Sequence, residues 1–130
     1  MNATFTGADA AAAYAFVAAA YAVVRLQNSA EELEEHLELC SEFAVGQAYA
    51  AFIMSLAGAS QHAARRAGLA RSVRAGIPRR ERQLVEILLL SVDGHRRRAA
   101  ALAAEHVEEF PDDGVALTIV DRWFERREAV

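Results

Sequence analysis

Two pairs of side chains in this sequence stand at spacings that could support chemistry. His36 and Cys40 are four residues apart, so on a helix they share a face, as two metal ligands or an activated thiol and its base do. His106 and Glu109 are three apart, but neither pair has a second pair elsewhere to complete a metal site. The sequence also has no glycine-rich phosphate loop, metalloprotease motif or nucleophile elbow. We therefore predict no catalytic, cofactor-binding or metal-ligating residue, and expect Cys40 to pack as a small hydrophobe.

The basic residues are the second candidate for chemistry. All 14 are arginine, and ten of them lie in residues 59–98, which carry a net charge of +7 between flanks of −6 and −5. Such a cluster could neutralise the phosphates of a nucleic acid or a nucleotide. It could equally be the solvated face of three helices, paired with acidic residues in about 31–40 and 95–110. No aromatic side chain alternates with the arginines and the whole chain is acidic, with a net charge of −4, so we predict that nucleic acid is not a partner.

Helical signals divide the chain into seven segments, and no alternating strand pattern is present. Alanine, the best helix former, occurs 30 times. Asp9 is a candidate N-cap for the first helix and Asn28 a candidate stop, while Ser29 and Glu32 form a capping box that would open the second helix. The predicted helices cover about residues 9–27, 31–40, 42–57, 60–76, 78–92, 95–110 and 113–127.

Serine, glycine, proline and aspartate mark the ends of the later helices. We expect Ser60 to cap the fourth helix and Gly76 to follow its last turn. Pro78 suits the first turn of the fifth helix, where its missing amide hydrogen is not needed. Asp112 or Asp113 is expected to cap the seventh helix.

Two of the predicted hairpins follow one template, 36 residues apart. In both, an apolar helix stops at a glycine, Gly58 or Gly94, and a second helix follows with alanine at matched places, among them Ala63 and Ala99. Such self-similarity is the signature of stacked helical hairpins, in which each unit buries its apolar face against the next. Arrays of this kind usually supply a binding surface rather than a reaction.

The spacing of Gly58, Ala63, Gly94, Ala99 and Pro111 resembles that of the turn glycine, packing alanine and terminal proline of tetratricopeptide repeats. The stretch 77–113 resembles more closely an atypical branch of that superfamily, exemplified by tetratricopeptide repeat protein 38, in its RER at a helix start, its glycine turn and its proline with aspartate. The resemblance covers about residues 41–115. It implies one all-α domain over residues 1–130, built as a right-handed stack of hairpins at about 9–40, 42–76 and 78–110 with a terminal helix at about 113–127.

In such arrays the first helix of each hairpin lines a concave groove. The repeat register places Arg25 of the first hairpin, Val45 and Phe52 of the second, and Leu84 and Leu88 of the third on that face. The resulting groove is largely apolar, whereas grooves that clamp peptides usually carry several basic or amide side chains. We therefore expect it to bind a hydrophobic helix, an apolar ligand or a second copy of the chain.

The terminal helix carries apolar side chains over more than half of its circumference. They include Trp123 and Phe124, residue types that are typical of interface anchors. Because a terminal repeat normally has a polar outer face, we predict a homodimer in which this helix and the groove meet. Two alternatives stay open: the helix fills the groove of its own chain, or the groove is a small-molecule or enzyme pocket with Arg25 and Glu81 as polar handles.

Cysteine content and hydropathy indicate the cellular compartment of the protein. A single cysteine excludes an internal disulfide and suits a reducing cytosol. The longest apolar run, Ala10–Val24, has 15 residues, fewer than the roughly 20 that a membrane-spanning helix needs. The sequence thus predicts a cytoplasmic helical-repeat module that binds a protein partner or itself, with no cofactor and no membrane.

Overall fold

A computed structural model describes residues 5–21 and 26–125, and all regular secondary structure in these ranges is helical. Seven α-helices and no strand are present in this described part, as the sequence predicts. Their bounds are α1 Ala10–Tyr21, α2 Leu26–Leu39, α3 Ala44–Leu56, α4 Ser60–Val73, α5 Arg79–Val92, α6 Arg96–Glu109 and α7 Gly114–Val120. A 3₁₀ turn, Arg74–Gly76, follows α4, and a π-helical turn, Asp121–Glu125, follows α7.

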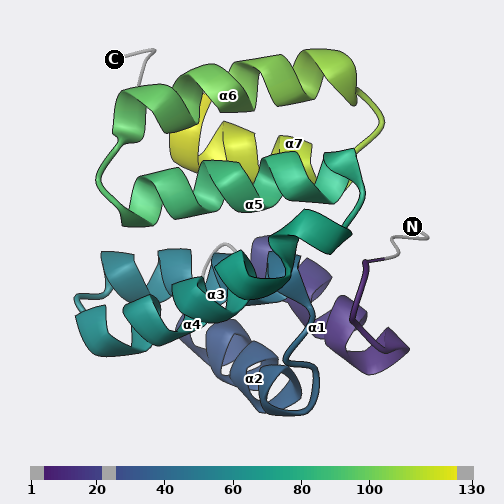
Figure 1. Ribbon diagram of the computed structural model, residues 1–130, viewed down its shortest axis with the longest axis vertical. Helices are drawn as coiled ribbons and strands as arrows, with labels where there is room; N and C mark the ends of the chain where they lie inside the picture. The colour runs from purple at the N-terminus through teal and green to yellow at the C-terminus, as the bar shows by residue number, and fades with distance from the viewer. Residues whose placement is uncertain (1–4, 22–25, 126–130) are drawn as a thin grey trace.

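Consecutive helices pair as hairpins: α1 with α2, α3 with α4, and α5 with α6 (Figure 1). α3 also packs along α5, so the second and third hairpins stack directly on each other. The first hairpin is placed differently, because α1 packs chiefly against α2 and α7. None of the helices in the described ranges combines the length and apolar character that crossing a membrane requires.

The two stacked hairpins turn in the same way. Gly58 and Gly94 both lie in the left-handed region, with φ of +83° and +86°. In each turn the glycine amide donates to the carbonyl three residues back, and the next amide donates to the carbonyl five residues back. This is the Schellman pattern that satisfies the last carbonyls of a helix. The 36-residue repeat of the sequence is therefore also a repeat of backbone hydrogen bonding.

We expect Gly58→Ala and Gly94→Ala each to lower the free energy of unfolding by about 1 kcal/mol, because an L side chain is strained in this conformation. Steric collision adds nothing, since a Cβ at either position meets no atom within 4 Å. Gly68→Ala is the matched control: it lies inside α4 in equally open space, so it should stabilise the helix by about 0.5–1 kcal/mol. Urea unfolding measures the stability of all three variants. If only one of the two turn variants lost stability, the two glycine turns would not be equivalent.

Several helix ends differ from the sequence prediction. Pro78 precedes α5 as its N-cap, and α7 ends at Val120, before a π-helical turn. α2 begins at Leu26, so Asn28 and Ser29, predicted as a stop and a cap, lie inside it. Weak helix formers continue a helix whose neighbouring turns are formed, because nucleation is the costly step. Ser60 is the first residue of α4 rather than its cap, and no side chain caps that helix. Gly76 closes a 3₁₀ turn without a positive φ, so it is not a left-handed terminator.

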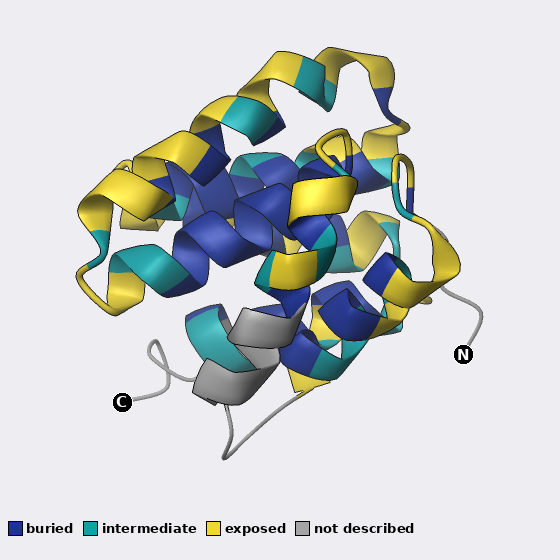
Figure 2. Ribbon diagram, turned by 90° about the horizontal axis from the view of Figure 1, so that it is seen from below, coloured by how far each residue is buried: buried dark blue, intermediate teal, exposed yellow. Residues whose placement is uncertain are grey.

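The core centres on Phe16 of α1, which is fully buried. Its ring centroid lies 5.0 Å from that of Phe5, 5.7 Å from that of Phe43 and 5.5 Å from that of Tyr49, and all three contacts are edge-to-face. Aromatic rings prefer this geometry over direct stacking. Figure 2 shows the buried residues gathered on the inward faces of the helices, with exposed residues outside. Phe16 of α1 thereby contacts both Phe5 and Tyr49 of α3.

Candidate interaction site

The predicted groove residues of α3 and α5 lie in the core. Val45, Leu84 and Leu88 are fully buried, and Phe52 is 5% exposed. They are buried because α3 packs along α5 and the C-terminal segment covers the same region. Arg25, which the sequence also assigns to the groove, lies outside the described residues.

The C-terminal segment occupies the Phe52 end of this region. The Trp123 ring meets the Phe52 ring edge-on with centroids 5.4 Å apart, and the Phe124 ring stacks on it at 6.2 Å. Phe124 is 8% exposed, while Trp123 is partly buried against the core. Within one chain, therefore, the terminal segment fills the space that the sequence assigned to a partner.

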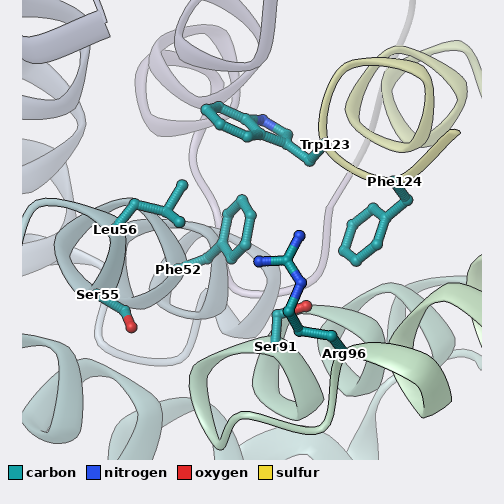
Figure 3. Close-up of a pocket in the computed structure, with 7 residues that line it drawn as sticks. All are labelled: Phe52, Ser55, Leu56, Ser91, Arg96, Trp123 and Phe124. Carbon is teal, nitrogen blue, oxygen red and sulfur yellow. The ribbon is translucent and has the colours of Figure 1, made fainter. Parts of the chain in front are cut away.

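A small pocket remains beside these rings (Figure 3). Its volume is about 30 Å³, which is room for a water molecule but far below the roughly 300 Å³ at which small-molecule sites begin. In Figure 3 the Arg96 side chain points toward the rings of Phe52 and Phe124. The lining residues are Phe52, Ser55, Leu56, Ser91, Arg96, Trp123 and Phe124.

A larger cleft lies between α4 and the end of α5. Its volume is about 260 Å³, and the Arg71–Asp93 ion pair, 2.7 Å long, stands at one side. Its other lining is small: alanine side chains from α4, two serines and Val92. The cleft offers one charged pair and little apolar depth to a ligand.

Tyr49 and Trp123 form a buried polar contact behind the pocket. Burial raises the pKa of Tyr49 to about 12, against the opposing influence of the Trp123 indole and the Arg122 charge. The Tyr49 hydroxyl donates to the Ala19 carbonyl at 3.4 Å. The Trp123 indole N–H lies near this hydroxyl without reaching hydrogen-bonding geometry, so it is a buried donor without an acceptor. The phenol stays protonated at neutral pH and acts here as a structural donor.

Many arginines of the basic cluster are paired with acidic side chains of other elements. Four of these contacts are solvent-exposed and are expected to contribute little to stability, whereas in the Arg80–Asp113 pair the carboxylate is only 5% exposed. They nevertheless occupy guanidinium groups that a nucleic-acid phosphate would otherwise meet. The pairs are Arg65–Glu38, Arg71–Asp93, Arg74–Glu86, Arg79–Glu109 and Arg80–Asp113.

Arg66 departs from the solvated face that the sequence suggests for this cluster, because its side chain is only 2% exposed. Its guanidinium donates to both oxygens of Glu34 at 2.9 Å, to Glu38 at 2.8 Å and to the Gln47 amide oxygen at 3.1 Å. Burial opposes its charge, but the Glu34 and Glu38 carboxylates outweigh that effect and raise the pKa of Arg66. The network joins α2, α3 and α4.

Asp113 anchors α7 to the rest of the protein. As the sequence predicts, it caps this helix, and its Oδ1 accepts the Ala116 amide at 3.3 Å. Its Oδ2 lies 3.2 Å from Nε2 of the buried His106 and 3.4 Å from the Arg80 guanidinium. On the other side of the imidazole, Nδ1 lies 2.8 Å from the Gln83 amide oxygen. Burial alone raises the pKa of Asp113, but these partners together lower it below its usual value of 3.8.

Because the folded pKa of Asp113 is depressed, its stabilising contribution is present above the unfolded pKa and is lost as pH falls through the folded value. We therefore expect Asp113→Asn to be less stable than the wild type at pH 7, and the difference to shrink as pH falls below about 4. The fluorescence of Trp123, the one tryptophan of the chain, follows urea unfolding at each pH. Asp112→Asn is the control, because it removes the same charge at the neighbouring, exposed position. A constant gap at all pH values would contradict this role of Asp113.

His36 and Cys40 keep their helical spacing, since the Cys40 amide donates to the His36 carbonyl at 3.0 Å. Cys40 is a free thiol, partly buried against the core. Among the side chains that the structure describes, no three His, Cys, Asp or Glu residues gather in a group that could hold a metal ion.

The outer face of α1 was not predicted from the sequence. Tyr14 is 78% exposed and Tyr21 is 40% exposed, and they stand two turns apart on one side of the helix. Ala11 and Ala18 lie on the same side. Their spacing of three, four and three residues is present in the sequence, but alanine also occupies most positions on the other faces of α1 and conceals the periodicity.

Comparisons with protein-family models, with curated proteins and with solved structures find no match to this chain. The resemblance to tetratricopeptide repeats therefore rests on the residues and turn geometry of this chain alone.

Proposed function

We propose that the protein is a helical-repeat interaction module of the tetratricopeptide type that self-associates as a homodimer. The repeat architecture is supported by the two hairpins that turn identically 36 residues apart and by the packing of α3 along α5. A right-handed stack of this kind serves as a scaffold that presents surfaces. The observation that carries the proposed self-association is the uncharged outer face of α1.

This face is a stripe of four residues, Ala11, Tyr14, Ala18 and Tyr21, which we call the α1 stripe. α1 carries no charged residue along its whole length, Ala10–Tyr21. The three-four-three spacing of the stripe is that of the contact positions between two packed helices. An aromatic stripe of this kind facing solvent is typical of an interaction surface.

The α1 stripe is complementary to a second copy of itself. When two α1 helices run antiparallel about a two-fold axis level with Phe16, Ala11 faces Tyr21 of the other copy and Tyr14 faces Ala18. Each tyrosine ring then meets a small alanine, so the helices approach closely and the rings fill the space between them. No like charges are brought together. This surface replaces the terminal helix in our proposal, because Trp123 and Phe124 pack within their own chain.

Light scattering tests the proposal directly. We expect a dimer mass for the wild type at micromolar concentration. Tyr14→Glu should weaken the dimer by about 100-fold, because a carboxylate would be buried without a partner at about 3 kcal/mol. Leu39→Glu is the matched control, since Leu39 is 84% exposed on α2 outside the stripe, and it should remain dimeric. A monomeric wild type would refute self-association.

Small-molecule binding is the second candidate function, because the cleft of about 260 Å³ between α4 and α5 comes close to the roughly 300 Å³ at which small-molecule sites begin. The Arg71–Asp93 pair there would be the polar handle, since Glu81, one of the two handles that the sequence suggests, already bonds Thr6. Ala64→Phe narrows this cleft without touching the α1 stripe. A ligand that stabilises the wild type thermally but not this variant would favour the second candidate.

A further inference from the structure

Residues 5–7 occupy a defined site on the helical body. The site centres on Glu81 in the first turn of α5, a carboxylate residue that is only 3% exposed. Its Oε1 accepts the Thr6 backbone N–H at 2.7 Å, and its Oε2 accepts the Thr6 hydroxyl at 2.8 Å. Thr6 lies 75 residues away in sequence and belongs to no helix.

The residue before Thr6 enters an aromatic cage. Phe5 is 6% exposed, and its ring centroid lies 5.0 Å from that of Phe16 and 5.8 Å from that of Phe43. The Arg80 guanidinium stands 5.3 Å from the centre of the Phe5 ring, where a cation is attracted by the ring's electron-rich face. An aliphatic side chain at this place would lose both kinds of contact.

The residue after Thr6 must be glycine. Gly7 has φ of +81°, and a Cβ added there would collide with the backbone carbonyl of Glu42. Residues 5–8 form a turn, closed by the Ala8 amide donating to the Phe5 carbonyl at 3.3 Å. Three successive residues of this turn are thus recognised by different means: an aromatic ring by the cage, an N–H with a hydroxyl by a buried carboxylate, and the absence of a side chain by close backbone contact.

A carboxylate buried in this way needs hydrogen-bond donors, and among the described residues the two donors to Glu81 are the amide and the hydroxyl of Thr6. We propose that Glu81, Arg80, Phe16 and Phe43 form a binding site for a peptide turn in which an aromatic residue is followed by threonine or serine and then glycine. In the single chain, residues 5–7 fill the site and compete with such a segment. The site rests on the proposed role as an interaction module, but not on the α1 stripe.

Residues 5–7 compete with a partner peptide for the site and therefore lower its apparent affinity. A tethered segment is present at an effective concentration on the order of millimolar, so a free peptide of the same sequence binds the wild type weakly. Any change that releases residues 5–7 raises the apparent affinity of the site. The Gly7→Ala substitution does this while every residue of the site stays unchanged.

The experiment uses the full chain and a fluorescent peptide with the sequence of residues 2–8, titrated by anisotropy. We expect the peptide to bind Gly7→Ala at least ten times more tightly than the wild type. Binding should fall about tenfold when Glu81→Gln is added to Gly7→Ala, and equally when threonine in the peptide is replaced by valine. Circular dichroism checks that each variant keeps its helices, and Thr6→Val replaces Gly7→Ala if that variant loses them.

A second measurement needs no variant. In the wild type, hydrogen exchange at the Thr6 amide should accelerate when excess peptide displaces residues 5–7, and the valine peptide should leave it unchanged. The proposed site is overturned if the peptide binds neither folded variant, or if Glu81→Gln binds it as tightly as its parent. Light scattering reports the dimer independently, so a dimer without peptide binding rejects only the site. Peptide binding by a monomeric wild type rejects only the dimer.

Discussion

The variant Arg66→Ala is expected to unfold at a clearly lower urea concentration than the wild type, with a loss of about 2–4 kcal/mol in the free energy of unfolding. The guanidinium is 2% exposed and is held by Glu34, Glu38 and Gln47. Removing it leaves two carboxylates facing each other and an amide oxygen without its donor. The lower part of the range applies if water hydrates the two carboxylates once Arg66 is removed, because the Glu34 and Glu38 side chains are 28% and 56% exposed.

The neighbouring arginine provides the matched control. Arg65 is 57% exposed and approaches Glu38 only to 3.7 Å, so Arg65→Ala should change stability by no more than about 0.5 kcal/mol. Both variants remove one positive charge from adjacent positions of α4. A similar loss in the two would mean that net charge, and not the buried network, determines the stability of this region.

The variant Phe16→Ala is expected to lose about 3–5 kcal/mol, the usual cost of emptying a fully buried aromatic position. Phe16 makes three edge-to-face contacts, so its removal leaves a cavity bounded by Phe5, Phe43 and Tyr49. It also removes one wall of the cage that holds Phe5, and hydrogen exchange at the Thr6 amide should accelerate with it. Thermal and urea unfolding measure the first effect, and exchange measures the second.

Val17→Ala is the control on the same helix. Val17 is partly buried, and its truncation should lower stability by about 1 kcal/mol and leave the Thr6 amide protected. If Phe16→Ala were no more destabilising than Val17→Ala, the aromatic cluster would not be the centre of the core.

Both described ends of the chain pack onto the α3–α5 pair. Thr6 bonds Glu81 of α5, while Phe124 stacks on Phe52 of α3. The groove that the sequence predicted for a partner is thereby covered within the chain at its Phe52 end. The outer face of α1 stays exposed and carries no charge. This division explains why the proposed dimer uses α1 and why the proposed peptide site requires release of residues 5–7.

The helices could be predicted from sequence because their ends depend on local interactions. Gly58, Gly94 and Asp113 have the predicted roles, since a left-handed turn or a side-chain cap involves only residues a few positions away. The same locality explains the error at Asn28 and Ser29, where a helix continued through two residues that suit its ends. The number of helices and the repeated turn were therefore predictable.

The candidate site was decided by contacts between distant segments. Arg65 and Arg66 are identical neighbours in sequence, yet only Arg66 faces α2 and becomes buried between Glu34 and Glu38. Likewise, the register that assigned Phe52 to an open groove could not show that Phe124 would cover it. Periodicity places a side chain on a face of its own helix, whereas the position of α2 or α7 relative to that face depends on how all the apolar faces are buried together. The sequence by itself thus determined the helices, their turns and their repeat, and only the tertiary structure decided which faces stay open to a partner.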